Sequence, residues 1–263
     1  MKILIMVDME GISGITSSDQ VNADSGRFYA EGRQYVTWET NACIDGCFAG
    51  GADEVIVRDA HMYGKNLLWE QLDSRAQYVV GQTGDIRLPD IESCDGVILL
   101  GYHAMAGTPG AVLEHTMSSA GWQKLKVNGT AFGEIGIDAA YAGEYGVPVI
   151  LVSGDDKCCA EARSLIPGVL TAQVKEAYSL CGARLLSREA AHALIRRKSA
   201  EAAGRCLGQR PFSVAHPVTI TLEVTERSPL PSLRNRPYLR CIDGHTIEVT
   251  ADSFVDAFWK ILL

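Results

Sequence analysis

The sequence predicts an α/β fold with a largely parallel sheet flanked by helices, and a smaller, less regular α+β subdomain toward the C-terminus. Short apolar runs bounded by turn residues are typical of strands buried on both faces of a parallel sheet. These runs alternate with helix-like patterns, as expected for βα units. The chain has 263 residues, of which 47% are hydrophobic. This length suits one large domain, or a main domain with a smaller one.

The clearest alternation lies in the first 160 residues. Helix-like patterns, one of them stopped by Gly50-Gly51, predict helices between the apolar runs. Asn128-Gly129 lies between alternating residues and predicts a tight hairpin. In chain order we expect a strand at 3–7, a helix at 28–49, strands at 54–58 and 97–100, a hairpin at 123–132, a helix at 135–145 and a strand at 147–152.

The pattern becomes less regular beyond Pro167. We therefore divide the chain into an α/β core over 1–160 and a C-terminal part over 161–263, which is expected to pack on the core and to contribute to oligomerisation. The loop at 227–237 contains three prolines and is expected to be a flexible or interface segment. The elements expected here are a helix at 188–204, a strand at 218–224, a hairpin around 243–244 and an amphipathic helix at 253–262.

Composition excludes several classes of protein. The chain carries 24 Lys and Arg against 32 Asp and Glu, a formal net charge of −8, which argues against nucleic acid or an anionic membrane as the main partner. No apolar run reaches the roughly 18 to 20 residues that a membrane-spanning helix needs. The N-terminal segment lacks the features of a signal peptide, so we expect a cytoplasmic protein.

Cysteine spacing gives no sign of a metal or redox motif. The eight cysteines include no CxxC pair, which argues against a zinc ribbon or a thioredoxin-type site. We expect most of them to be small core residues, because free cysteine is commonly buried.

Polar side chains follow the expected strands at the point where each strand ends. Asp8 and Glu10 follow the first strand, His61 the second and His103 the third, and Glu134 opens the helix after the hairpin. Ligands bind at the carboxyl edge of open parallel sheets. Each of these residues taken alone has an ordinary interpretation as a turn, cap or core residue. Their shared placement instead predicts a common site.

The donor set of this site suits metal ions. Carboxylates and imidazoles without thiolates fit Zn²⁺, and also Mn²⁺ or Co²⁺. Three carboxylates with two divalent cations leave a charge of about +1, enough to hold and acidify a water, whereas one cation leaves about −1. The charges therefore favour two ions, provided that all five residues converge.

His115 is the candidate catalytic residue. It lies twelve positions after His103, and the loop at 107–110 can fold it back over the same edge of the sheet. The other candidates receive structural roles: His192, His216 and His245 as surface residues, and Asp155-Asp156 as a helix cap.

The segments that carry these candidate residues, taken in their order along the chain, resemble the D-aminopeptidase family, the M55 metallopeptidases. The resemblance spans about the first 160 residues. The opening segment and the segment at 101–104 are the most specific, and the C-terminal hundred residues offer weaker anchors. The matching segments are Val7-Asp8-Met9-Glu10-Gly11-Ile12-Ser13-Gly14, Asp59-Ala60-His61, Gly101-Tyr102-His103-Ala104, Thr108-Pro109-Gly110 with His115, Gly133-Glu134-Ile135-Gly136 and Gly154-Asp155-Asp156.

This resemblance implies a dinuclear zinc site and a ring-like homo-oligomer. Asp8 would bridge the two ions, Glu10 would bind one of them, and His61, His103 and Glu134 would complete the other. It also implies that His115 is catalytic and acts as a nucleophile. The residue chemistry leaves two other roles open for His115, as a proton shuttle or as a stabiliser of the tetrahedral intermediate.

The sequence thus predicts a zinc-dependent aminopeptidase that hydrolyses short peptides with an unblocked N-terminal residue through a water activated by the dinuclear metal site. Residues 1–160 are expected to form its metal-binding catalytic core. A preference for D-residues, as in D-Ala-D-Ala, comes only from the resemblance. Glu10 with its ion, and Asp59, are candidate anchors for the α-amino group. One alternative is a metal-dependent amidase or phosphoesterase, although few basic residues flank the motifs. Another is a non-catalytic peptide-binding component of a transport system.

Overall fold

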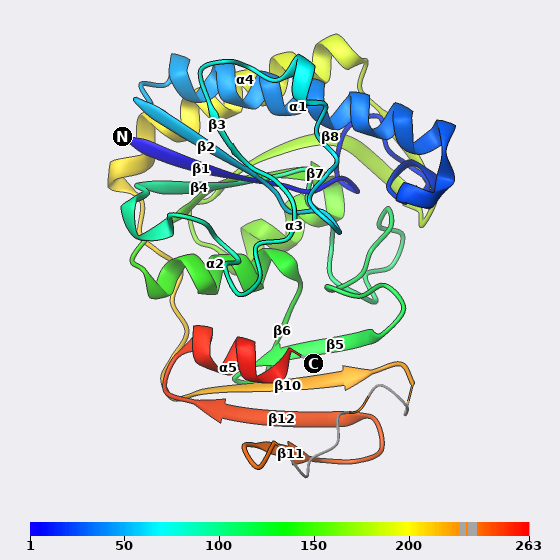
Figure 1. Ribbon diagram of the computed structural model, residues 1–263, viewed down its shortest axis with the longest axis vertical. Helices are drawn as coiled ribbons and strands as arrows, with labels where there is room; N and C mark the ends of the chain where they lie inside the picture. The colour runs from blue at the N-terminus through cyan, green and yellow to red at the C-terminus, as the bar shows by residue number, and fades with distance from the viewer. Residues whose placement is uncertain (227–229, 231–235, 263) are drawn as a thin grey trace.

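Seven strands form the larger sheet, in the order β3-β2-β1-β4-β7-β8-β9 (Figure 1). Their bounds are β1 Lys2–Val7, β2 Glu54–Asp59, β3 Gln77–Val79, β4 Gly96–Leu100, β7 Val149–Asp155, β8 Leu170–Ser179 and β9 Gly182–Leu185. All neighbours pair in parallel except β8 and β9, which form an antiparallel pair at one edge. The structure, a computed structural model, describes residues 1–226, 230 and 236–262.

Helices cover both faces of this sheet (Figure 1). Helices α1 (Arg27–Ala49) and α4 (Arg188–Arg205) lie on one face, and α2 (Glu134–Glu144) and α3 (Asp156–Leu165) on the other. Alternate residues of β1 enter different cores: Ile3 and Ile5 pack in the cluster that includes α1, whereas Leu4 and Met6 pack in the one that includes α2. Burial on both faces explains why this strand is a continuous apolar run.

A second, antiparallel sheet lies beyond α2, in the order β11-β12-β10-β5-β6 (Figure 1). Its strands are β5 Trp122–Val127, β6 Thr130–Phe132, β10 Val218–Val224, β11 Leu239–Cys241 and β12 Thr246–Ala251. Helix α5 (Phe254–Ile261) packs between this sheet and α2, so one apolar core joins the two layers. The β5–β6 turn places Asn128 at φ 47° and Gly129 at φ 85°, as a tight hairpin of the expected kind requires.

The expected fold class is confirmed, and each expected helix and strand has a counterpart at nearly the same residues. The division between the sheets, however, does not fall at residue 160. Strands β5 and β6 come from the N-terminal part but pair in the second sheet, whereas β8, β9 and α4 from the C-terminal part complete the first. Each sheet is therefore built from strands of both parts of the chain.

The cysteines and the helices of the structure can be compared with the remaining expectations from the sequence. All eight cysteines are free, and only Cys181 and Cys241 are exposed. Within the described ranges, no helix combines the length and the apolar character needed to cross a membrane. Most of the expected loop at 227–237 lies outside the described residues.

Candidate metal centre and active site

The candidate site lies at the carboxyl edge of the larger sheet, where β1 runs between β2 and β4. Asp8 follows β1, His61 lies two residues beyond β2, and His103 lies three residues beyond β4. Because the three strands are neighbours and parallel, their ends meet at one place. Glu134, the first residue of α2, reaches the same place from the face that α2 covers.

His61 faces two carboxylates. Its Nδ1 lies 3.0 Å from Oδ1 of Asp8 and 3.2 Å from Oε2 of Glu10. Its Nε2 lies 2.9 Å from the carbonyl oxygen of Val21 and can donate its hydrogen there. A backbone carbonyl on one ring nitrogen directs the lone pair of the other toward a metal ion. The ring is therefore oriented so that Nδ1 could bind a cation between the two carboxylates.

His103 has the same arrangement with its ring nitrogens exchanged. Its Nε2 lies 3.4 Å from Oδ2 of Asp8 and 3.3 Å from Oε1 of Glu134, and its Nδ1 lies 3.0 Å from the carbonyl oxygen of Ala104. The two oxygens of Asp8 thus face different histidines. This placement of Asp8 between His61 and His103 is the geometry that a bridging ligand needs.

His115 lies against His103, as the sequence predicted from the intervening loop. The two rings stack with centroids 4.0 Å apart and planes 13° apart. The Nε2 of His115 lies 3.7 Å from Oε1 of Glu134, and its Nδ1 lies 2.9 Å from the carbonyl oxygen of Leu113. Donor atoms of His103, His115 and Glu134 lie within 4.8 Å of one another, so the geometry alone also permits His115 to be a ligand.

Three buried atoms at this edge have no hydrogen-bond partner among the described residues: Oδ2 of Asp8, Oε2 of Glu10 and Nε2 of His103. A buried polar atom without a partner is costly, and such atoms are rare unless something else satisfies them. Asp8, Glu10 and His103 each offer a donor atom within 4.8 Å of those of the other two, and together they combine oxygen and nitrogen donors. Both properties fit a divalent transition metal.

The electrostatics of the site point to the same kind of ligand. Burial, reinforced by the neighbouring Glu10, raises the pKa of Asp8 to about 6. Burial by itself would lower the pKa of His103, but the adjacent carboxylate of Glu134, together with the charges of Asp8 and Glu10, raises it to about 10. Three carboxylates this close together in a low-dielectric environment repel one another, so a bound cation would stabilise them strongly.

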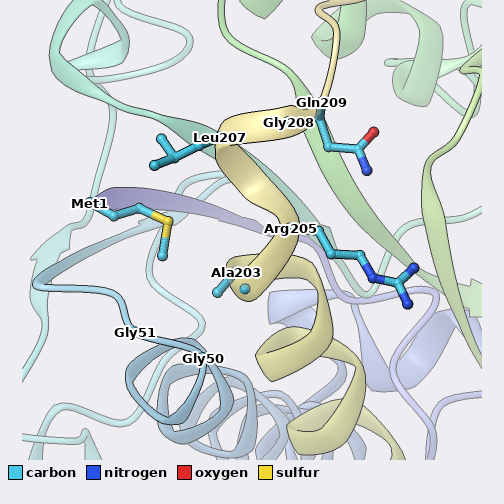
Figure 2. Close-up of a pocket in the computed structure, with 9 residues that line it drawn as sticks. Met1, Gly50, Gly51, Ala203, Arg205, Leu207, Gly208 and Gln209 are labelled. Carbon is cyan, nitrogen blue, oxygen red and sulfur yellow. The ribbon is translucent and has the colours of Figure 1, made fainter.

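A cavity of about 190 Å³ opens onto these groups and is lined by His61, His115 and Glu134 among others. A larger pocket of about 590 Å³ lies elsewhere, where Met1 and Gly50 line it together with Leu207 (Figure 2). That pocket lies at the amino ends of the strands and its lining contains no carboxylate side chain, histidine or cysteine. The chemistry therefore belongs to the smaller cavity.

Lys175 holds the loop that carries Glu10. This residue of β8 is buried, and its Nζ donates to the carbonyl oxygens of Glu10, Ile12 and Ile15 at 2.5, 2.9 and 2.6 Å. Burial lowers the pKa of Lys175 to about 8, so it remains mainly an ammonium at neutral pH. An ammonium has three donors, one for each carbonyl. Nothing in the spacing of the sequence indicated this role.

We expect Lys175→Met to lower the free energy of unfolding by about 2–4 kcal/mol, because three buried carbonyls lose their donor while the cost of burying an ammonium disappears. Zinc affinity should fall with it, since the loop between Asp8 and Ile15 loses its anchor. Chemical denaturation and zinc titration measure the two effects. Lys198→Met, which removes a lysine paired with Glu201 on α4, serves as the control and should change neither. Unaltered zinc affinity in a destabilised Lys175 variant would restrict this lysine to folding.

Two acidic residues near the site have structural roles. The carboxylate of Asp59 accepts hydrogen bonds from the backbone N of Asn66 and Leu67 and from Nδ2 of Asn66, so its expected role as an anchor for the substrate amine is wrong. Asp155 caps α3 as expected, accepting from the backbone N of Cys158 at 2.7 Å. Its other oxygen accepts from the backbone N of Val112, in the loop before His115.

Sequence reasoning missed the cationic residue of the site cavity. Arg87 lines it together with Tyr102, and both side chains bond to the buried carboxylate of Asp138. Arg87 lies in an irregular segment with no periodic signal, so only the fold brings it here. Of the three histidines expected at the surface, His216 is exposed and His192 and His245 are half-buried, and none of them lines the site cavity.

Comparisons with known proteins agree with this geometry. A family model for peptidase family M55, described as D-aminopeptidase, matches residues 1–263. A D-aminopeptidase of Bacillus subtilis (strain 168) is 41% identical over an alignment covering 76% of this chain and 73% of that protein. A solved structure described as the Zn-dependent D-aminopeptidase DppA from Bacillus subtilis, a self-compartmentalizing protease, matches with a TM-score of 0.94 at 32% identity, covering 100% of this chain and 96% of that one. The chain therefore belongs to the D-aminopeptidase family of metallopeptidases.

Proposed function

We propose that the protein is a zinc-dependent aminopeptidase that hydrolyses short peptides with an unblocked, D-configured N-terminal residue, using two zinc ions per chain. The observation that carries the proposal is the convergence of three carboxylates and two imidazoles, with three unpaired buried atoms among them. Similarity to a protein described as a Zn-dependent D-aminopeptidase supports both the metal and the stereochemistry. The excess of negative charge supports two ions over one.

Each ligand has a distinct place in this proposal. Asp8 would bridge, since its two oxygens face His61 and His103. Glu10 would share an ion with His61, because the two side chains approach to 3.2 Å, whereas the resemblance implied that His61 joins His103 and Glu134. Glu134 binds beside His103, and its Oε1 is held by the backbone N of Met117 at 2.8 Å. Zinc, when bound there, polarises a carbonyl group and lowers the pKa of a water. Glu10 remains the candidate anchor for the α-amino group of the substrate.

His115 is proposed as the catalytic residue. Its side chain reaches the cavity and is 16% exposed, whereas that of His103 is 1% exposed. Because Nδ1 is engaged by the carbonyl of Leu113, Nε2 is the atom that faces the reacting groups. At Nε2, His115 can act as a nucleophile, carry a proton or stabilise a developing oxyanion.

The test compares D-Ala-D-Ala with L-Ala-L-Ala as substrates for the zinc-loaded protein, measured by release of alanine. We expect turnover of the D,D peptide and little of the L,L peptide, lost after removal of zinc by a chelator and restored when zinc is returned. Metal-dependent turnover of the L,L peptide alone would overturn the stereochemistry and keep the aminopeptidase. Faster cleavage of an amino-acid amide or of p-nitrophenyl phosphate would move the function to an amidase or a phosphoesterase. Tight peptide binding without turnover would instead indicate a transport component.

We also propose a cytoplasmic homo-oligomer in which residues 161–263 form part of the interface. The related solved structure is described as a self-compartmentalizing protease, and the β8–β9 hairpin of this chain exposes Tyr178 and Leu180 at 62% and 53%. Contiguous exposed apolar residues are typical of interfaces. Eight free cysteines fit a reducing compartment. Sedimentation as a monomer at working concentration would contradict the oligomer, and cell fractionation tests the location.

A further inference from the structure

A second cavity, of about 410 Å³, adjoins the site cavity. The two share four lining residues: Ala60, Met62, Arg87 and Met117. The second cavity lies where the larger sheet meets α5, and its lining is mostly apolar. Two arginines, Arg58 and Arg87, are the only charged side chains in this lining. A peptide cleaved in the first cavity can therefore extend into the second.

Arg58 is a buried cation with no carboxylate partner. It is 8% exposed, and its Nη1 donates to the carbonyl oxygen of Gly81 at 2.7 Å. It forms no salt bridge with any carboxylate of the described residues; Asp59 follows it on β2, points to the other face of the sheet and is fully engaged by Asn66 and Leu67. Burying a charge without a counterion costs free energy, so an anion bound in the cavity would stabilise Arg58.

Arg87 adds a second positive charge to the lining of this cavity. Its Nε and Nη2 bond to the two oxygens of Asp138, which leaves Nη1 without a hydrogen bond to any residue that the structure describes. Asp138 balances one of the two guanidinium charges, and the net charge of the three groups is about +1. Burial lowers the pKa of Arg58 most; the charge of Asp59 opposes this, and the nearness of Arg87 lowers the pKa further. The apolar remainder of the lining, which includes Phe258 and Trp259, strengthens any ion pair formed here.

We propose that the arginine-lined cavity, formed around Arg58 and Arg87, binds the free C-terminal carboxylate of a short peptide substrate. Successive residues of a peptide are about 3.8 Å apart, so this carboxylate lies only one or two residues beyond the scissile bond of a di- or tripeptide. Arg87 lines both cavities, as such a short reach requires. Guanidinium groups bind carboxylates through two parallel hydrogen bonds. The enzyme therefore recognises both ends of its substrate.

This inference rests on the proposed function and makes it narrower, since it selects peptides with a free carboxylate. Few basic residues flank the motifs in the sequence, but the fold brings two arginines to the cavity beside the site. Position in the sequence does not show the role of either arginine. Arg58 is the next-to-last residue of β2, directly before the Asp59-Ala60-His61 segment, and Arg87 lies in an irregular segment.

The test compares D-Ala-D-Ala with its C-terminal amide, D-Ala-D-Ala-NH₂, in the zinc-loaded protein. We expect the wild type to prefer the acid by about 10- to 100-fold in kcat/KM, the range for a hydrogen bond to a charged group. In Arg58→Met the acid should lose most of this preference through a higher KM with kcat nearly kept, whereas the amide should lose far less. Arg58→Lys, which keeps a charge, should recover part of the preference.

The control is Arg196→Met, which removes one arginine from α4 on the opposite face of the sheet, where it pairs with Asp45. This variant should retain the wild-type preference, which separates recognition from a general change of net charge. Equal turnover of acid and amide by the wild type would overturn the inference and leave the aminopeptidase intact, and this arm requires no variant to fold. An unchanged preference in folded Arg58→Met would also overturn it. Failure of the wild type to hydrolyse either peptide would remove the proposed function, and the inference with it.

Discussion

Replacement of His103 by alanine is expected to abolish peptide hydrolysis and to remove metal together. The side chain is almost fully buried, and its Nε2 is one of three unpaired atoms that converge at the site. Its Nδ1 is engaged by the carbonyl oxygen of Ala104, which directs Nε2 toward Asp8 and Glu134. A rotated ring would lose one of these two contacts. Without this imidazole, Asp8 and Glu134 face each other across a cavity with less positive charge to separate them. We expect kcat/KM to fall by at least about 10³-fold.

Metal content decides whether the loss has this cause. Elemental analysis should find about two zinc ions per chain in the wild type and fewer in His103→Ala, as the charge argument predicts. His245→Ala is the matched control, because His245 is a half-buried histidine in the turn before β12 of the second sheet, and the pocket that it lines shares no residue with the site cavity. Full zinc content and normal turnover in folded His103→Ala would show that His103 is not a ligand. One zinc per chain in a fully active wild type would remove the dinuclear proposal.

Replacement of His115 by alanine is expected to reduce kcat by about 10²- to 10⁴-fold while the metal content stays at the wild-type value. The reason is position: His115 is the most exposed of the three histidines at this edge, and it stacks on His103 without a close contact to Asp8 or Glu10. Its Nε2 is directed into the cavity beside Glu134. Loss of this atom removes the group proposed to act on the substrate and leaves the five proposed ligands in place.

His115→Phe is the control that separates chemistry from packing. A phenyl ring can keep the stack on His103 but has no nitrogen, so this variant should be as inactive as His115→Ala and should bind as much zinc. Recovery of turnover in His115→Phe would show that only the stacking matters. Loss of metal in both variants would make His115 a ligand, an arrangement that its proximity to Glu134 and His103 permits. Turnover near the wild-type value in either variant would reject its catalytic assignment.

Local patterns account for most of what could be predicted. The apolar runs at 3–7, 54–58 and 97–100 indicated strands because strands buried on both faces are uniformly apolar, and the three strands lie side by side as a parallel sheet requires. Asn128-Gly129 predicted its hairpin because both residues tolerate positive φ. The β8–β9 hairpin escaped prediction, since its burial is uneven and its pairing depends on β7.

The candidate ligands could be named from the sequence because each follows a predicted strand or opens a predicted helix, and the topology of parallel sheets brings such positions together. The roles of Asp59, Lys175, Arg58 and Arg87 could not. Asp59 and His61 have the same kind of position in the sequence, and only the hydrogen bonds from Asn66 and Leu67 distinguish a structural carboxylate from a free one. The two arginines come together because a strand and an irregular segment meet at one cavity.

The sequence by itself thus determined the fold class, the edge of the sheet that carries chemistry and the residues that gather there, because these depend on patterns within single elements. Tertiary structure alone decided the exchange of strands between the two sheets, the anchoring of the Glu10 loop by Lys175 and the cationic cavity beside the site. These features depend on contacts between residues distant in the chain. Such contacts are selected by packing and by the cost of burying unpaired charge, neither of which leaves a local signal.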